Sequence, residues 1–235
     1  MTTCNPVLAI DNLSLEFPAY QSSVKALNGV SLHVNPGEIV GVVGESGSGK
    51  SVTAMLSMRL LPERSYRITS GSLSMLDRDM LNAPEKDLLK IRGRDAAMIF
   101  QEPMTALNPT RRIGRQMLDV IIHHQKISTR EAHAKAVALL RDMHIASPEQ
   151  VLDSYPFELS GGMRQRVMIA LAFSCEPQLL IADEPTTALD VTVQRQVLLL
   201  LREKARQKGT AILLITHDMA LVSQFCDRVY VMYTG

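Results

Sequence analysis

Apolar residues along this chain fall in short runs that turn-forming residues separate. Val7–Ile10 and Leu13–Phe17 have extended apolar patterns on either side of Asp11 and Asn12, which predicts two strands. Val30–Val34 alternates apolar and polar residues, the pattern of a strand with one buried face. The N-terminal region is therefore predicted to consist of strands.

Strand and helix patterns alternate through much of the remaining chain. Ile39–Val43 is wholly apolar, as expected for a strand buried on both faces of a parallel sheet, and the helix-compatible residues Lys50–Leu61 follow a glycine-rich loop. Further strands are predicted at Leu179–Asp183, Ala211–Thr216 and Val229–Met232, and further helices at Val191–Lys208 and Met219–Cys226. This order favours the α/β class.

The middle of the chain is mostly helical in pattern. It begins with a short predicted strand, Ala96–Phe100, and a capping box at Ser128 and Glu131 precedes a helix over Ala132–Met143. After Gly162 a helix is predicted to about Cys175. We expect one domain over residues 1–235, in which residues 1–93 and 167–235 form the core and about 94–166 form a helical insertion.

Composition narrows the class of protein. With 46% hydrophobic and 21% charged residues among 235, the chain is predicted to fold as a soluble protein. Lys plus Arg number 25 and Asp plus Glu 24, so the chain lacks the basic surplus that nucleic-acid-binding proteins usually carry. No nucleic-acid partner is therefore expected. No apolar run has the length of a membrane span, and no secretion signal is visible. The separated cysteines Cys4, Cys175 and Cys226 are expected to be reduced, in an intracellular protein.

A glycine-rich loop carries the strongest chemical signal. It follows an apolar strand, precedes a helix and satisfies G-x-x-x-x-G-K-[ST]. In this pattern, backbone N–H groups bind phosphates, the lysine reaches the β- and γ-phosphates, and the final hydroxyl can bind Mg²⁺. The predicted nucleotide-binding residues are Gly44, Glu45, Ser46, Gly47, Ser48, Gly49, Lys50 and Ser51.

Other polar residues at predicted strand ends and at a helix start complete the constellation. Asp183 ends an apolar strand where it can hold Mg²⁺, and Glu184 can accept a proton from attacking water. Gln101 can touch metal or water through its amide, and His217 can donate a hydrogen bond to a γ-phosphate. A second anion-binding helix start is predicted at Ser160, Gly161 and Gly162.

Together and in this order, these residues closely resemble the ATP-binding subunit of an ATP-binding cassette (ABC) transporter, from about Leu8 to Tyr233. The resemblance implies a P-loop NTPase core with an N-terminal antiparallel β region and an inserted α-helical subdomain. It makes Ser160–Gly162 the signature that contacts ATP of the opposite subunit, and Asp190 the D-loop residue. Phe17 stands where the family places an adenine-stacking aromatic, with Tyr20 as the competing candidate.

Finer features resemble the oligopeptide/dipeptide/nickel importer branch. They are Met163 after the signature, where glutamine is most frequent, and the segments 99–109, 155–158 and 182–190. Within this branch the chain is most similar to D-type dipeptide importer subunits, the D,D-dipeptide kind included. Members continue past the position of Gly235 with an extension often containing clustered cysteines. This sequence has no such extension, so an iron–sulfur cluster cannot be claimed, and a truncated chain is one interpretation.

The resemblance implies an ATPase that uses ATP and Mg²⁺ to drive import of a dipeptide-like or oligopeptide-like solute. Its expected partners are a second ATP-binding subunit (identical or paralogous), two transmembrane permease subunits and a solute-binding protein. Its expected place is peripheral, on the cytoplasmic face of the bacterial inner membrane. The alternatives are an ABC-type ATPase of DNA maintenance or translation, and a nucleotide-binding regulatory module without turnover, against which Asp183 and Glu184 together argue.

Overall fold

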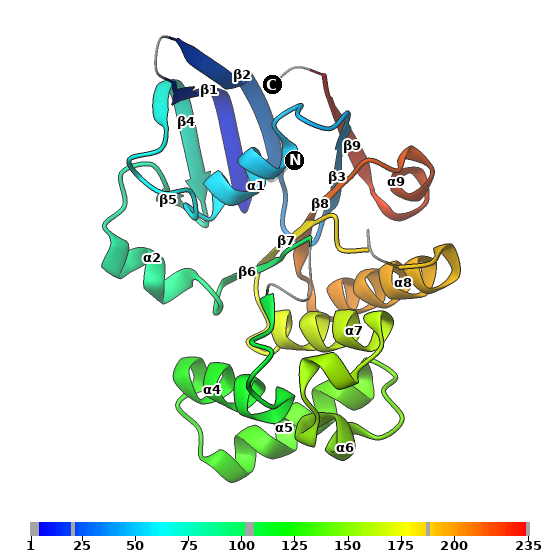
Figure 1. Ribbon diagram of the computed structural model, residues 1–235. Helices are drawn as coiled ribbons and strands as arrows, with labels where there is room; N and C mark the ends of the chain where they lie inside the picture. The colour runs from blue at the N-terminus through cyan, green and yellow to red at the C-terminus, as the bar shows by residue number, and fades with distance from the viewer. Residues whose placement is uncertain (1–4, 20–21, 102–105, 187–188, 234–235) are drawn as a thin grey trace.

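The computed structural model describes residues 5–19, 22–101, 106–186 and 189–233, and its strands form two sheets (Figure 1). The antiparallel sheet has the order β2-β1-β4-β5, and the parallel sheet has the order β6-β7-β8-β3-β9. The strands are β1 (Leu8–Pro18), β2 (Ser23–Val34), β3 (Ile39–Gly44), β4 (Arg67–Met75), β5 (Arg78–Asp79), β6 (Ala96–Ile99), β7 (Leu179–Asp183), β8 (Ala211–Thr216) and β9 (Arg228–Met232). The predicted fold class is confirmed.

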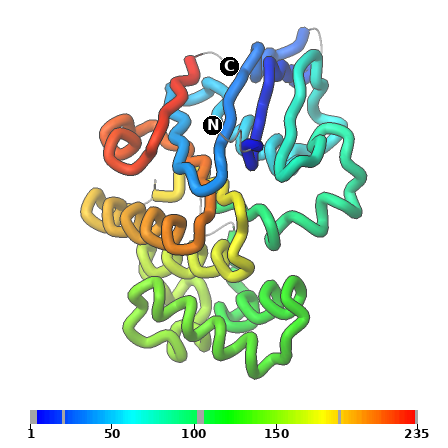
Figure 2. The backbone as a smooth tube through the Cα atoms, turned by 180° about the vertical axis from the view of Figure 1, so that it is seen from behind, coloured from blue at the N-terminus to red at the C-terminus, as the bar shows by residue number. Residues whose placement is uncertain are grey.

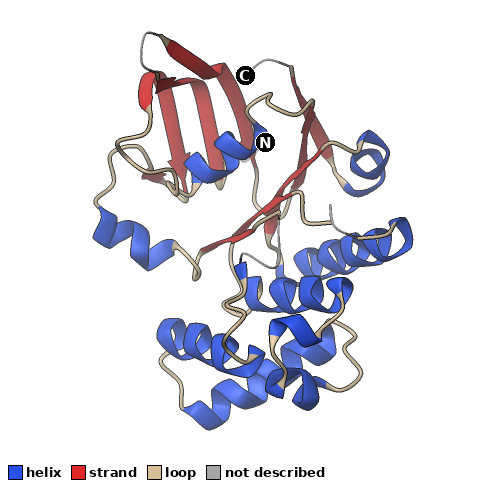
Figure 3. Cartoon of the chain, viewed as in Figure 1, coloured by secondary structure: helices blue, strands red, loops and turns tan. Residues whose placement is uncertain are grey.

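The helices of the described residues cover the parallel sheet and form a separate layer at one end (Figure 3). They are α1 (Lys50–Ser57), α2 (Glu85–Ile91), α4 (Ile113–Gln125), α5 (Thr129–Asp142), α6 (Pro148–Asp153), α7 (Gly161–Ala172), α8 (Val191–Lys208) and α9 (Met219–Phe225), with a 3-10 helix at Pro156–Glu158. The strands predicted at Leu179–Asp183 and Ala211–Thr216 and the helix at Val191–Lys208 have the predicted bounds.

The antiparallel sheet corrects one prediction about the N-terminal strands. The two strands expected around Asp11 and Asn12 are a single strand, β1, whose pairing with β2 shifts register between Ile10 and Leu13. Asn12 has a φ of 47°, a left-handed conformation that asparagine tolerates well, and its N–H donates to Ser31 Oγ at 2.8 Å. The bulge absorbs the polar pair, so the strand continues through it.

The parallel sheet brings the predicted site residues to one edge. Because its strands run in the same direction, the carboxyl ends of β6, β7, β8 and β3 meet at that edge. β6 pairs in register with β7, so this strand lies in the sheet although it falls within the range 94–166. Ligands of open α/β sheets bind outside the carboxyl ends of the strands.

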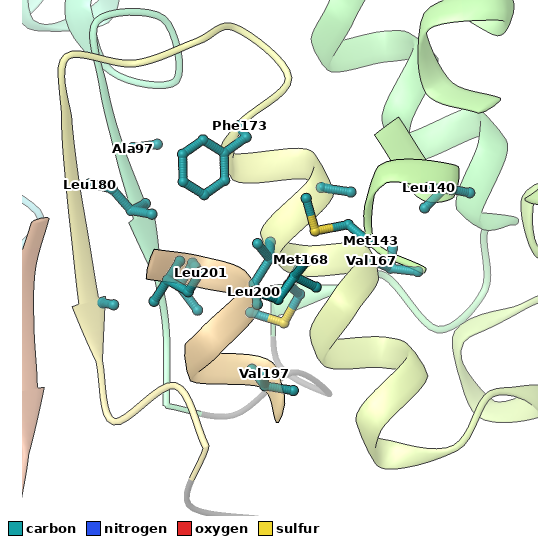
Figure 4. Packing of buried hydrophobic residues seen from close by; sticks show 14 of the residues in the cluster. Ala97, Leu140, Met143, Val167, Met168, Phe173, Leu180, Val197, Leu200 and Leu201 are labelled. Atoms are coloured by element: carbon teal, nitrogen blue, oxygen red, sulfur yellow. The ribbon is translucent and has the colours of Figure 1, made fainter. Parts of the chain in front are cut away.

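Both faces of the parallel sheet are buried against different layers. Val40, Val42 and Ile181 contribute to a core shared with α1 and the antiparallel sheet. Leu180 and Leu214 contribute to the opposite core, which α7 and α8 cover; Figure 4 shows its packing. Alternate residues of each strand therefore point to opposite layers, as the period of two along a strand requires.

The helical layer lies beyond α7 (Figure 2). Helices α4, α5 and α6 contact one another, and α7 packs against α5 and α8. The predicted capping box begins α5: Ser128 Oγ accepts from the Glu131 N–H, and Glu131 Oε2 accepts from the Ser128 N–H at 2.9 Å. Through α7, this layer connects to the core of the parallel sheet.

Candidate active site

The phosphate loop joins β3 to α1, and its glycines are required by its shape. Gly47 and Gly49 have φ values of 84° and 93°, in the left-handed region that favours glycine. A Cβ added at Gly44 would lie 2.1 Å from the backbone oxygen of Met232, and one at Gly49 would lie 2.6 Å from that of Ala26. The glycines therefore permit both the turn and the close packing of the loop against neighbouring backbone.

Lys50, at the first turn of α1, is folded back over the loop. Its ammonium group donates to the backbone oxygens of Gly44 and Glu45, both at 2.8 Å, and the residue is only 5% exposed. Ser48 Oγ is buried and has no hydrogen-bond partner within the described part of the chain. A buried hydroxyl without a partner is costly, and a phosphate oxygen would satisfy it. The loop therefore fits a bound phosphate group.

A hydroxyl and a carboxylate meet beside this loop. Ser51 Oγ donates to Asp183 Oδ1 at 3.1 Å, although the two residues are 132 positions apart. Asp183 ends β7 and is 5% exposed, and burial raises the pKa of its carboxyl group, while the hydrogen bond from Ser51 opposes that shift. Hydroxyl and carboxylate oxygens are ligands that suit Mg²⁺, so this donor set fits the predicted metal.

Glu184 lies between two other predicted residues. Its Oε2 accepts from Gln101 Nε2 at 3.1 Å, and its Oε1 lies 3.3 Å from His217 Nδ1. Gln101 follows β6 and His217 follows β8, the two strands on either side of β7. The structure thus brings Gln101, Asp183, Glu184 and His217 to the same sheet edge as the phosphate loop.

The predicted signature lies elsewhere in the fold. Ser160 precedes α7 and its Oγ accepts from the Met163 N–H at 3.3 Å, so it is the N-cap of that helix. Helix α7 covers one face of the parallel sheet, and α1, which follows the phosphate loop, covers the other (Figure 1). The structure therefore does not bring Ser160, Gly161 and Gly162 to the phosphate loop of their own chain.

Asp190 caps the neighbouring helix. Its Oδ1 accepts from the Val193 N–H at 3.0 Å at the start of α8. A Cβ added at Gly162 would lie 2.9 Å from Val193 Cγ1, so the signature and the start of α8 pack closely. Gly162 of the signature thus lies beside the first turn of the helix that Asp190 caps.

Phe17 lies near the end of β1, opposite Val24 of β2. It is half-buried against the core that the antiparallel sheet shares with α1, and Val24 is 59% exposed. Tyr20 lies outside the described residues. The choice between Phe17 and Tyr20 as the adenine-stacking residue stays a prediction.

One residue with a positioning role was missed in the sequence. Asp218 accepts from the N–H groups of Ala220 and Leu221 at the start of α9, and its own N–H donates to Thr216 Oγ1 at 3.1 Å. These bonds fix the turn that carries His217. The signal was Asp218, two positions after the predicted strand Ala211–Thr216, because aspartate is a preferred N-cap.

An apolar cavity of about 310 Å³ is lined in part by Phe100, the residue before Gln101. It lies between the end of α1, β6, α4 and α7, and its lining includes Leu60, Phe100, Val120 and Leu171. Leu60 and Phe100 are each 38% exposed. The same loop therefore carries Gln101 to the sheet edge and Phe100 to an apolar surface.

Among the described residues, no helix is both long and apolar enough to cross a membrane.

Comparison with protein families gives a direct match. A family model described as "ABC transporter" matches residues 27–187. A second model, described as "AAA domain, putative AbiEii toxin, Type IV TA system", matches residues 153–223. The first match contains the phosphate loop, the signature and the strand that ends at Asp183.

Individual relatives and a solved structure agree with the family match. The chain is 70% identical to the "Probable D,D-dipeptide transport ATP-binding protein DdpD" of Escherichia coli (strain K12), over 98% of this chain and 70% of that protein. It is 49% identical to the "Oligopeptide transport ATP-binding protein AppD" of Bacillus subtilis (strain 168), over 97% and 70% of the two chains. The "Dimeric Structure of MJ0796, a Bacterial ABC Transporter Cassette" superposes with a TM-score of 0.84 at 26% identity, covering 97% of this chain and 95% of that one. Fold, site and relatives agree, and the chain belongs to the ATP-binding subunits of ABC transporters.

Proposed function

We propose that this chain hydrolyses ATP to energise the import of a dipeptide-like or oligopeptide-like solute. The observation that carries the proposal is the 70% identity to DdpD over 98% of the chain. The site supports it, because a phosphate loop, a buried carboxylate and a candidate base meet at one sheet edge. The D,D-dipeptides are the first solutes to test.

Each residue of the site has a role in this proposal. Lys50 and the loop N–H groups bind the phosphates of ATP, while Ser51, Asp183 and Gln101 hold Mg²⁺. A bound Mg²⁺ neutralises charge on the phosphate oxygens. Glu184 accepts the proton of the attacking water, and His217 donates a hydrogen bond to the γ-phosphate.

The signature acts on a second subunit in this proposal. Ser160–Gly162 precede α7, on the sheet face opposite α1, and Gly162 lies beside the start of the helix that Asp190 caps, so in this proposal they contact ATP bound by a partner. The similar MJ0796 cassette has been solved as a dimer. The partner here is an identical or paralogous ATP-binding subunit, and ATP lies between the two.

Transport needs membrane partners in addition. We place two permease subunits and a solute-binding protein with this ATPase, which is then peripheral on the cytoplasmic face of the inner membrane. The cavity lined by Leu60 and Phe100 offers an apolar surface for a permease segment. Because Phe100 lines the cavity and directly precedes Gln101, docking there would affect the sheet edge.

Reconstitution tests the proposal. The ATPase, a partner ATPase and two permease subunits would be placed in proteoliposomes with the solute-binding protein. We expect D-Ala-D-Ala to stimulate ATP hydrolysis and to accumulate inside, with glucose as the control solute. An ATP hydrolysis rate that does not change with permeases or peptides but increases with DNA or ribosomes would contradict the proposal. It would favour a role in DNA maintenance or translation.

A further inference from the structure

Side chains at three adjacent strand ends form a continuous series of contacts. Gln101 follows β6, Glu184 follows β7 and His217 follows β8, and these strands are neighbours in that order. Gln101 Nε2 lies 3.1 Å from Glu184 Oε2, and His217 Nδ1 lies 3.3 Å from Glu184 Oε1. The Glu184 carboxylate is thus contacted on both oxygens, once from each neighbouring strand.

The chemistry of a carboxylate determines which end of the Gln101 amide faces it. An ionised carboxylate only accepts hydrogen bonds, whereas an amide has an NH₂ donor and a carbonyl acceptor. The NH₂ group of Gln101 therefore donates to Glu184, and Gln101 Oε1 is left to face a donor or a cation. One amide can serve the base and a bound cation with different atoms.

The backbone alone does not aim the Glu184 carboxylate. Glu184 has a φ of 45°, an uncommon left-handed conformation for this residue, and its N–H donates to the backbone oxygen of Ile215 at 2.9 Å. These features fix the main chain. A glutamate side chain still has several rotatable bonds, so side-chain contacts, those with Gln101 and His217 among them, orient the carboxylate.

We propose that Gln101 is a positioning residue, whose NH₂ group holds the Glu184 carboxylate in the orientation that proton transfer needs. This role is separate from that of Gln101 Oε1 as a metal ligand. It rests on the proposed function, in which Glu184 takes the proton of the attacking water. A general base must lie within hydrogen-bond reach of the proton that it abstracts, so loss of its orientation lowers turnover more than nucleotide affinity.

Thermal unfolding without nucleotide, in the presence of a chelator, tests the contact itself. Gln101→Glu places two carboxylates together and is expected to lower the melting temperature. The combined change Gln101→Glu and Glu184→Gln exchanges amide and carboxylate, and should recover most of the loss. Gln224→Glu, at an exposed position of α9, controls for added charge. Additive effects of the two single changes would overturn the contact, and with it the proposal.

Steady-state kinetics tests the positioning role. Gln101→Glu keeps an oxygen for the cation but loses the NH₂ donor, whereas Gln101→Ala loses both. We expect Gln101→Glu to keep Mg²⁺-dependent ATP affinity within about threefold while kcat falls by about tenfold or more. In Gln101→Ala, we expect both the Mg²⁺-dependent ATP affinity and kcat to fall. An unchanged kcat in Gln101→Glu, with an active wild type, overturns this role alone. A wild type that binds ATP without hydrolysing it overturns the proposed function, and the positioning role with it.

Discussion

Asp183 and Glu184 are consecutive residues with different surroundings. Asp183 is 5% exposed, accepts from Ser51, and has a pKa raised by burial. Glu184 has a left-handed φ of 45° and contacts Gln101 and His217. The Asp183 carboxylate therefore lies beside the phosphate loop, and the Glu184 carboxylate lies beside the ends of the neighbouring strands. In the proposed reaction, the first holds Mg²⁺ and the second takes the proton.

Replacing Glu184 by glutamine tests this division of roles. The amide has nearly the same shape but cannot take a proton, so Glu184→Gln should lower ATP turnover by roughly 10²–10⁴-fold. Nucleotide affinity should change little, because Lys50 and Ser51 are untouched. Phosphate release and ATP affinity would be measured on the same preparation. Near-normal turnover would contradict the role of Glu184 as the base.

Phe17 provides a second test at this scale. If its ring stacks on adenine, Phe17→Ala should weaken ATP binding by about 1–2 kcal/mol, on the scale of aromatic contacts. Phe17→Tyr should be almost neutral, because the ring remains. Titration of each variant with ATP measures the affinity, and its melting temperature reports any loss of packing in the half-buried site. A larger affinity loss in Tyr20→Ala would make Tyr20 the adenine platform.

At the scale of elements, local signals were enough for some predictions and not for others. β7 and β8 are apolar up to their last residues, Asp183 and Thr216, and Asp190 caps α8 while Gly209 ends it at a φ of 68°, so their bounds followed from sequence alone. The helix predicted over Lys50–Leu61 is shorter, because Arg59 has a φ of 49° and α1 ends at Ser57. The sequence signals that define a strand or helix lie within that element, whereas the elements that pack against it can be far away in the sequence.

Contacts between distant elements were not predicted from the sequence. The phosphate loop was predictable because its glycines, lysine and serine act within eight consecutive positions. The bond between Gln101 and Glu184 joins residues 83 positions apart, and it depends on the pairing of β6 with β7. β4 was not predicted, since its pattern is broken by Gly71, whose φ is 90°.

Gly41 has no side chain, and this allows helix α9 to pack closely against β3. It lies in the middle of β3, and a Cβ there would come within 2.5 Å of Val222 Cγ1 and 3.0 Å of Cys226 Sγ. Helix α9, which follows His217, can therefore approach β3 only at a glycine. Gly41→Ala should lower the free energy of unfolding by about 1–3 kcal/mol through overpacking.

A double-mutant cycle with Val222→Ala separates overpacking from other effects of the alanine. The smaller side chain leaves room for the added methyl group, so the combined variant should lose less stability than the sum of the two single changes. Chemical denaturation of all four proteins measures this. Strict additivity would mean that the alanine is accommodated without displacing α9.

At the scale of the molecule, the two functional surfaces are separated by the parallel sheet. The phosphate loop leads into α1 on one face, while the signature leads into α7 on the other. The sequence could supply both sets of residues, but only the fold shows that the helices following them cover opposite faces of the sheet. In the proposed function a complete site requires a second subunit, and this proposal predicts how two defects combine.

The test uses the complete transporter with two distinguishable ATPase subunits. In the first assembly, Lys50→Ala in this chain is combined with a disabled signature serine in the partner. Both defects then fall in the site formed by this phosphate loop and the partner's signature, and the other site stays whole. In the second assembly, Lys50→Ala and Ser160→Arg are placed together in this chain, so each site carries one defect.

The first assembly should therefore retain more ATPase activity than the second, provided that the phosphate loop and base of the partner are competent. Rates are compared at saturating ATP, so that a change in affinity alone does not separate the assemblies, and each single variant serves as a control. Equal activity in the two assemblies would mean that Ser160 serves its own chain or that the sites hydrolyse only together. Greater activity in the second assembly would contradict the proposed exchange of signatures, because the same two defects would then cost less in one chain than across two.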